Sequence, residues 1–150
     1  MQLNDKQKEN IRKMCTVEYQ NDFSERQQKG QFFTPAELII KMIEKFASLE
    51  GCFIDPCAGS GNLLVGLIAA GVSPENIYYN ELDIKEYTEG KKRLMALGVP
   101  ETNFTNMDVL SDDFRNYYEN SDMNVIINPP YKGSLHLKIL NILVEMFTKL

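Results

Sequence analysis

Short apolar runs and longer amphipathic segments alternate along most of the chain. The apolar runs are bounded by turn residues and predict four strands, at residues 52–54, 77–79, 104–107 and 125–127. The segments between them have helical spacing, at residues 62–70, 85–97 and about 111–118. Strands that alternate with helices form parallel sheets through right-handed crossovers, with helices on both faces. The pattern therefore predicts an α/β fold.

The chain before the first strand is predicted to be helical. Residues 1–30 are charged and rich in Gln, and the apolar positions Ile11, Met14, Cys15 and Tyr19 suit a modest amphipathic helix. A second helix is predicted to follow, in which Thr34 caps the start, Pro35 takes the first helical position and Glu37 lies in the first turn. Its predicted apolar face consists of Leu38, Ile39, Met42, Ile43 and Phe46.

Composition limits the classes of protein to consider. The 150 residues suit one domain, and a hydrophobic fraction of 43% is enough for a buried core. A net charge of −5 argues against a chain that binds nucleic acid by itself. Cys15, Cys52 and Cys57 lack paired spacing, so we expect no disulfide framework, no metal site and a reducing cytoplasm. We expect no signal peptide or membrane anchor, because the N-terminus is polar and the apolar runs are short.

Unusual polar residues follow each predicted strand. Asp55, Glu81, Asp108 and Asn128 all lie at or just past a strand end. In open parallel sheets, ligands bind outside the carboxyl ends of the strands, where the strand order reverses. We therefore expect these four side chains to share one site.

The first of these ends carries a glycine turn, "DPCAGSGNLL" at residues 55–64. Gly59 and Gly61 allow a tight turn and a close approach to a ligand, and the following helix directs its free N–H groups at the same place. The spacing fits neither GxGxxG nor a phosphate loop. Asp55 would repel a pyrophosphate but attract an ammonium group, as in S-adenosylmethionine. A strand-to-helix connection without a ligand would use the same glycines.

The next two strand ends each carry one acidic residue. Glu81 lies about twenty residues past the glycine turn, where a carboxylate can accept both hydroxyls of a ribose. Asp108 could accept a hydrogen bond from an adenine amine, with Val109 or Leu110 against the ring. A solvated surface position for Glu81 and a turn position for Asp108 are the alternatives.

The last strand runs into "NPPY", residues 128–131. The side-chain carbonyl of Asn128 and the backbone carbonyl of Pro129 can both accept hydrogen bonds from one NH₂ group. Two prolines, Pro129 and Pro130, stiffen this platform, and Tyr131 offers a ring on which a flat substrate can stack. The alternative is a Pro-Pro turn that ends the strand beside a buried tyrosine.

Four motifs together resemble the S-adenosylmethionine-dependent DNA methyltransferases that act on the exocyclic N6 of adenine, as in restriction-modification systems. They are "GQFFTP" (30–35), "DPCAGSGNLL" (55–64), "NELD" (80–83) and "NPPY" (128–131), in the order of the group whose cofactor motifs precede the catalytic one. The resemblance implies a Rossmann-like class I methyltransferase fold. It also implies direct methyl transfer to a flipped adenine, without a metal.

The resemblance implies a role for each matching residue. The cofactor-binding set is Phe33, Thr34, Pro35, Asp55, Pro56, Gly59, Gly61, Glu81, Asp108 and Asn128. The catalytic set is Asn128, Pro129, Pro130 and Tyr131, of which the tyrosine would stack on the flipped base.

The chain departs from the family after NPPY, because relatives continue with further strands and a target-recognition region. We therefore expect a helical extension at 1–30 and a partial methyltransferase domain at 31–150, shortened after about four parallel strands. Strand 125–127 would be an exposed edge, and the helix after Gly133 would lack a cover. A shortened chain, a degenerate product or half of a split enzyme would explain this. DNA would then be bound through a partner-supplied region, and a second copy or complementary chain would cover the edge.

Two other functions remain open at this point. NPPY also occurs in methyltransferases that act on a protein glutamine or on the amine of an RNA guanine, both planar NH₂ groups. A non-catalytic assembly module that binds a partner chain is the third reading. His136, the single histidine, is expected at a surface or interface rather than in catalysis.

Overall fold

A four-stranded parallel sheet forms the centre of the computed structural model, which describes residues 1–15 and 34–148. Its strands are β1 (Cys52–Asp55), β2 (Ile77–Asn80), β3 (Phe104–Thr105) and β4 (Met123–Val125). They lie in the order β3-β2-β1-β4, and every neighbouring pair is parallel. The strand order reverses at β1, which has β2 on one side and β4 on the other. The predicted Rossmann-like α/β fold is confirmed.

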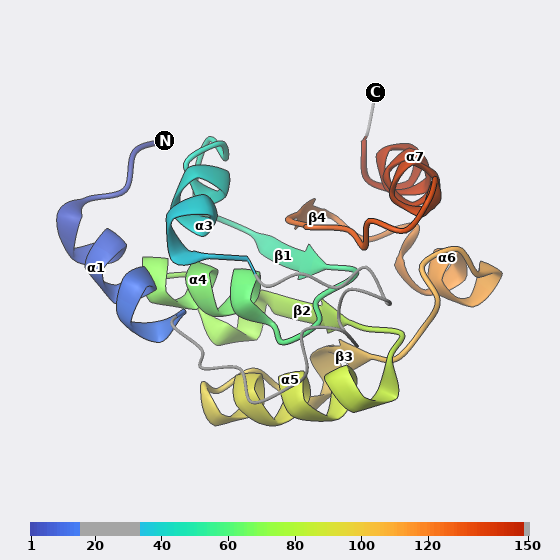
Figure 1. Cartoon of the computed structure of the whole chain (residues 1–150), viewed down its shortest axis with the longest axis horizontal. Helices are drawn as coiled ribbons and strands as arrows, with labels where there is room; N and C mark the ends of the chain where they lie inside the picture. Colours follow the sequence, from blue (N-terminus) through green and yellow to red (C-terminus); the bar gives the residue numbers. More distant parts are fainter. Residues whose placement is uncertain (16–33, 149–150) are drawn as a thin grey trace.

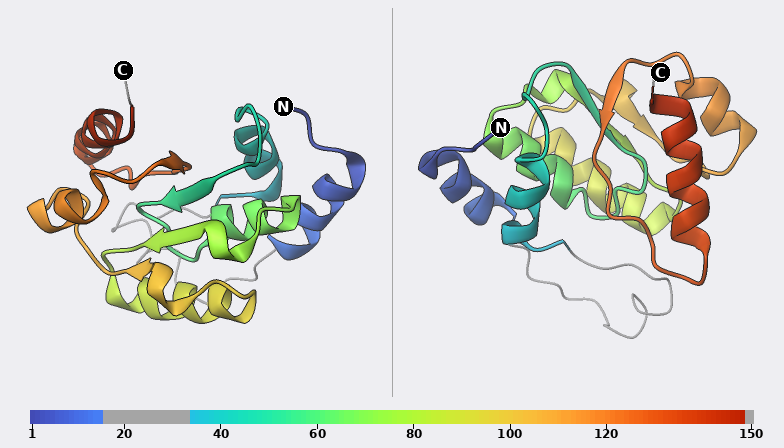
Figure 2. Two further views of the ribbon diagram at one scale, coloured as in Figure 1. Left: turned by 180° about the vertical axis from the view of Figure 1, so that it is seen from behind. Right: turned by 90° about the horizontal axis from the view of Figure 1, so that it is seen from above.

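Helices cover both faces of this sheet (Figures 1 and 2). The α-helices are α1 (Asp5–Met14), α3 (Ala36–Ile43), α4 (Asn62–Ala70), α5 (Ile84–Ala96), α6 (Asp112–Tyr118) and α7 (Leu135–Phe147). Two short 3₁₀ helices, η1 (Pro74–Asn76) and η2 (Glu101–Asn103), lead into β2 and β3. The first four α-helices contribute to one hydrophobic cluster, and α6 and α7 contribute to another.

The alternation of side chains along β1 and β2 separates these two clusters. Phe53 lies opposite Ile77 in the first cluster, and the next residues, Ile54 and Tyr78, lie opposite each other in the second. Phe53 and Ile54 are both fully buried. A strand that is covered on both faces reads as a continuous apolar run, which is why short runs marked these strands in the sequence.

The N-terminal helix packs against the main body. A capping box between Asn4 and Gln7 begins α1, and the side chains of Ile11 and Cys15 at its end are buried in the first cluster. The predicted amphipathic helix is therefore present. Tyr19 and the predicted boundary at residue 30 lie outside the described residues.

Helix α3 differs from its prediction in register and length. Pro35 occupies the N-cap position in an extended conformation, and no side chain caps the helix. The predicted cap at Thr34 and the predicted first helical position at Pro35 are therefore wrong. Leu38, predicted to be buried, is 43% exposed, whereas Ile40, which was not predicted, is buried in the first cluster.

The end of the chain also differs in part from its prediction. Strand β4 begins two residues earlier than expected, at Met123, and within the described residues it pairs only with β1. Helix α7 buries Ile139, Leu143 and Met146 in the second cluster, so one of its faces is covered by this chain. Leu135, Ile142 and Phe147 are half-buried against the same cluster, whereas Leu137, Leu140 and Val144 are exposed. No helix in the described ranges is long and apolar enough to cross a membrane.

Candidate active site

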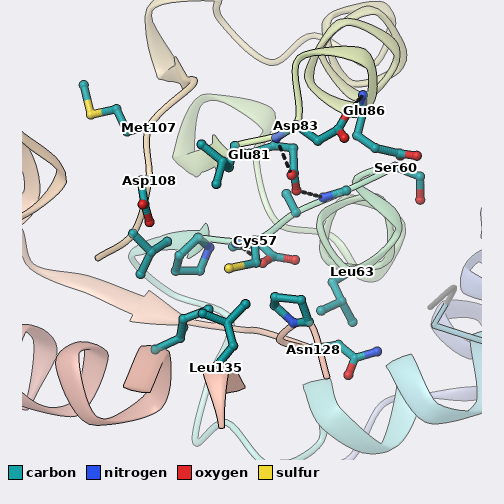
Figure 3. A pocket seen from close by; sticks show the side chains of 18 of the residues that line it. Cys57, Ser60, Leu63, Glu81, Asp83, Glu86, Met107, Asp108, Asn128 and Leu135 are labelled. Carbon is teal, nitrogen blue, oxygen red and sulfur yellow. Dashed lines mark hydrogen bonds between the residues drawn. The ribbon is translucent and has the colours of Figure 1, made fainter. Parts of the chain in front are cut away.

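A cavity of about 430 Å³ opens where the loops after all four strands converge (Figure 3). Of the predicted site residues, its lining includes Thr34, Asp55, Pro56, Gly59, Glu81, Asp108, Asn128 and Pro130. Pro35, Gly61, Pro129 and Tyr131 are not in the lining, and Phe33 lies outside the described residues. The fold therefore brings residues from all four strand ends to one cavity, although their individual roles stay predictions.

The glycine turn after β1 forms part of the cavity wall. Gly59 and Gly61 have φ angles of 52° and 79°, in the left-handed region that favours glycine. A Cβ atom on Gly59 would meet no atom within 4 Å, whereas one on Gly61 would lie 3.0 Å from Leu94. At Gly59 only the backbone conformation favours glycine, whereas at Gly61 the close approach of Leu94 on α5 favours it as well.

Asp55 places a buried carboxyl group at the end of β1. It is 1% exposed, and its Oδ1 accepts a hydrogen bond from the backbone N–H of Cys57 at 3.0 Å. Burial raises the pKa of Asp55 well above its ordinary value; the Cys57 N–H opposes this and the nearby Glu81 adds to it. No Lys, Arg or His of the described residues forms an ion pair with Asp55. A ligand with an ammonium group would supply the missing positive charge.

Glu81 lies at the end of β2 and is 7% exposed. Its two carboxylate oxygens accept hydrogen bonds from the backbone N–H groups of Gly59, at 2.8 Å, and Asp83, at 2.9 Å. Burial raises the pKa of Glu81, and the two N–H donors partly offset this effect. Each oxygen retains a second lone pair, so the group can hold the turn and still accept from a ligand.

Asp108 contributes an exposed acidic group on the loop after β3. Its Oδ1 accepts from the backbone N–H of Leu110 at 2.9 Å, which is the turn geometry of the alternative interpretation. Val109 and Leu110 also line the cavity. An acidic group beside an apolar wall would suit an adenine ring, so both interpretations remain compatible with this loop.

Asn128 lies on the loop that follows β4, and its position depends on Thr34. The Asn128 amide nitrogen donates to the Thr34 hydroxyl at 3.1 Å, and Thr34 is 5% exposed. Among the described residues, no donor bonds to the Asn128 side-chain oxygen. Tyr131 is 54% exposed, which contradicts the alternative that required a buried tyrosine. The centroid of the Tyr131 ring lies 5.4 Å from the centroid of the His136 ring.

Asn80 was not identified as a site residue from the sequence, although its side chain bonds to two loops that line the cavity. It is fully buried, and its amide nitrogen donates to the carbonyls of Pro56 and Met107, each at 2.9 Å. Its oxygen accepts from the Met107 N–H and the Thr105 hydroxyl. Asn80 therefore fixes the loops after β1 and β3 from the strand between them. It stands in the "NELD" motif, directly before Glu81, so its place at a strand end was the available signal.

The apolar part of the lining was missed as well. It includes Cys57, Leu63, Met107, Leu135 and Ile139. The last two lie on α7, whose docking over the second cluster could not be inferred from local patterns. Among the described residues, no group of three or more His, Cys, Asp or Glu side chains is arranged to hold a metal ion.

The sheet order, the glycine turn after β1 and the NPPY loop after β4 define a Rossmann-like methyltransferase fold. Residues 18–142 match the family model described as N-6 DNA Methylase, so the chain belongs to that family. The chain is also 31% identical over 125 residues to "Type II methyltransferase M.VspI" of Vibrio sp. (strain 343). That match covers 80% of this chain and 30% of the relative. No solved structure matches the chain.

Proposed function

We propose that this chain carries the cofactor-binding and catalytic part of an enzyme that methylates the N6 amine of adenine in DNA. The observation that carries the proposal is that Asn128 lines the same cavity as Asp55 and Glu81. The Asn128 side chain, whose amide oxygen can accept from an NH₂ group, therefore lies beside the space in which a methyl donor would bind.

S-adenosylmethionine is the cofactor that suits this cavity. The volume of about 430 Å³ is within the range of small-molecule sites. Asp55 would hold the ammonium group, the free lone pairs of Glu81 would accept ribose hydroxyls, and Asp108 with its apolar neighbours would contact the adenine. When bound, the cofactor supplies an electrophilic methyl group on a sulfonium.

The NPPY loop would orient the acceptor. The Asn128 side-chain oxygen and the Pro129 carbonyl would accept the two protons of the N6 amine, which concentrates the nitrogen lone pair out of the ring plane. The exposed ring of Tyr131 would stack on an adenine that has been flipped out of the duplex. The two prolines would keep the loop ordered before the acceptor arrives.

DNA is the proposed substrate, and its recognition would need more than the described surface. A net charge of −5 gives the chain little attraction for phosphates. The chain spans about 30% of the length of its curated relative. A further region, a second copy or a complementary chain would then supply contacts to DNA and cover the edge of β4.

The free thiols of Cys15, Cys52 and Cys57 suit a reducing cytoplasm.

Methyl transfer from labelled S-adenosylmethionine to DNA, RNA and a glutamine-containing protein, offered separately, tests the proposal. We expect label in DNA, recovered as N6-methyladenine, and loss of label in Asn128→Ala. The control is Asn116→Ala, which removes an exposed asparagine of α6.

Each alternative predicts a different result. Label in RNA or protein but not in DNA would favour a guanine or glutamine acceptor. Failure of all three acceptors, together with no heat of cofactor binding in calorimetry, would favour the assembly module. In that case, light scattering should show a self-associated chain.

A further inference from the structure

We propose that Asn62 is a positioning residue for Asn128 and acts through Thr34. Asn62 is the first residue of α4, directly after the glycine turn. It lines the cavity but belongs to neither predicted set of site residues. The inference rests on the proposed role of the Asn128 side-chain oxygen as an acceptor for the substrate amine.

The Asn62 side chain joins three separate segments of the chain. It is 3% exposed, and its amide nitrogen donates to the backbone carbonyls of Thr34, at 2.8 Å, and Cys15, at 3.2 Å. Its oxygen accepts from the Arg93 guanidinium at 2.9 Å. Both amide hydrogens and the carbonyl are therefore used. A fully bonded buried amide has one preferred orientation, because any other leaves buried groups unpaired.

Thr34 transmits this fixed position to the catalytic loop. Its backbone carbonyl is held by Asn62, and its hydroxyl accepts from the Asn128 amide nitrogen at 3.1 Å. One contact is made by the backbone and the other by the side chain of the same buried residue, so a shift of the Thr34 backbone moves the hydroxyl as well. The Asn128 nitrogen is engaged by Thr34 and none of the described residues donates to the Asn128 side-chain oxygen, so that oxygen can accept from the substrate.

Arg93 of α5 anchors the other side of Asn62. Its guanidinium also donates to the carbonyls of Ser60, at 3.2 Å, and Met14, at 3.1 Å. Ser60 lies in the glycine turn that lines the cofactor cavity. The same group of contacts thus connects the glycine turn at the cofactor cavity to the NPPY loop. This connection would fix the position of the methyl donor relative to the substrate amine. A misplacement of about 1 Å can reduce a rate about a hundredfold.

Asn62→Asp tests the inference most directly. Aspartate keeps the shape of the side chain and an acceptor for Arg93 but removes the N–H donors to Thr34 and Cys15. We expect kcat for methyl transfer to fall about ten- to hundredfold, a larger change than that in the Kd for S-adenosylmethionine.

The matched control is Asn103→Asp. Asn103 is also a buried asparagine whose amide nitrogen donates to two backbone carbonyls, those of Glu75 and Ile77, and it is not in the cavity lining. Asn103→Asp should lower thermal stability as Asn62→Asp does but leave kcat unchanged. Equal losses of kcat in the two variants would assign Asn62 a structural role only and overturn the inference. Loss of cofactor affinity with kcat unchanged would overturn it as well.

Two substitutions of Thr34 test the path of the effect. Thr34→Val removes the hydroxyl at nearly constant shape and should lower kcat, and Thr34→Ser should restore most of it. If Asn62 acts through Thr34, the double variant Asn62→Asp/Thr34→Val should lose no more than about the larger single loss. Additive losses would contradict the proposed path.

A measurement that needs no turnover separates this inference from the proposed function. In amide NMR, the Asn128 side-chain NH₂ should exchange slowly in the wild type and in Asn103→Asp, and faster in Asn62→Asp. This pattern would support the positioning role even if no acceptor were methylated, in which case only the proposed function fails. Unchanged exchange in Asn62→Asp would overturn the positioning role even in an active methyltransferase.

Discussion

The Glu81 carboxylate accepts a hydrogen bond from the backbone N–H of Gly59 at 2.8 Å, across 22 positions of the chain. The bond connects the end of β2 to the glycine turn after β1. The second oxygen of Glu81 accepts from Asp83, at the start of α5. Glu81 therefore shapes the cavity as well as lining it, so its substitution should affect both the turn and the ligand.

Glu81→Gln should weaken cofactor binding at least about tenfold. An amide retains one acceptor oxygen, so one of the two backbone N–H donors would face an NH₂ group and lose its partner. Isothermal titration calorimetry with S-adenosylmethionine measures the effect. Glu89→Gln, at an exposed position on α5, is the matched control and should bind as the wild type does. Equal affinities in the two variants would contradict the assignment of Glu81 to the cofactor site.

Gly90→Ala should damage the cofactor site from outside the cavity. A Cβ atom at Gly90 would lie 2.7 Å from the Gly59 carbonyl oxygen and would collide with the Tyr79 hydroxyl, which donates to that same carbonyl. The helix propensity gained by alanine, up to about 1 kcal/mol, would not offset this overlap, which typically costs about 1–3 kcal/mol. We expect a lower melting temperature together with weaker cofactor binding.

Gly66→Ala separates these two effects. A Cβ atom at Gly66 would collide with the Ile39 side chain, in the first hydrophobic cluster and away from the cavity lining. Gly66→Ala should lower the melting temperature in a thermal scan. At a temperature where the chain is folded, its cofactor Kd should stay within about twofold of the wild-type value. If Gly90→Ala behaved in the same way, contact with the Gly59 turn would be irrelevant to binding.

Asp55→Asn should stabilise the folded chain at neutral pH and weaken cofactor binding. Folding raises the pKa of Asp55 above its ordinary value of 3.8, so the folded state keeps a proton over a range in which the unfolded chain has lost it. The contribution of this group to stability is complete below pH 3.8 and is lost as the pH rises through the folded pKa. Asparagine removes the buried charge and keeps an acceptor for the Cys57 N–H.

Melting curves as a function of pH measure this prediction. Near pH 7.5 the variant should melt higher than the wild type, by about 2–4 °C for each kcal/mol regained in a chain of this size. The gain should shrink as the pH falls toward the ordinary value of 3.8, because the carboxyl group then carries its proton in the unfolded as well as the folded wild type. A gain that is constant with pH would show that the carboxyl ionisation is not its cause.

The sequence predicted individual elements better than the contacts between them. Helix α4 has the bounds predicted for it, and the structure shows Gly61 and Gly71, both in the left-handed region, at its two ends. The four strand ends converge because parallel topology requires it, so the placement of Asp55 and Glu81 in one cavity followed from order alone.

Contacts that depend on tertiary packing could not be predicted. Thr34 was expected to cap α3, but its hydroxyl instead accepts from Asn128, 94 positions away. Capping α3 and accepting from Asn128 would each give the Thr34 hydroxyl a hydrogen-bond partner. Only the position of the loop after β4 decides which of the two bonds forms. The cavity wall formed by Leu135 and Ile139 likewise depends on where α7 docks. Long-range contacts between loops leave no periodic signal in the sequence.

Tyr131→Ala should weaken binding of the DNA substrate without affecting the stability of the fold or the binding of the cofactor. The ring is 54% exposed, so its removal should change the free energy of unfolding by about 0.5 kcal/mol or less. Stacking of one base on an aromatic ring contributes about 1–3 kcal/mol, so KM for DNA should rise about ten- to hundredfold. Tyr131→Phe keeps the ring face and should retain most of the activity. Tyr117→Ala removes a comparably exposed tyrosine, at 56%, from α6 and should leave KM unchanged. Equal KM values for Tyr131→Ala and Tyr117→Ala would mean that the exposed ring of the NPPY loop does not contact the flipped base.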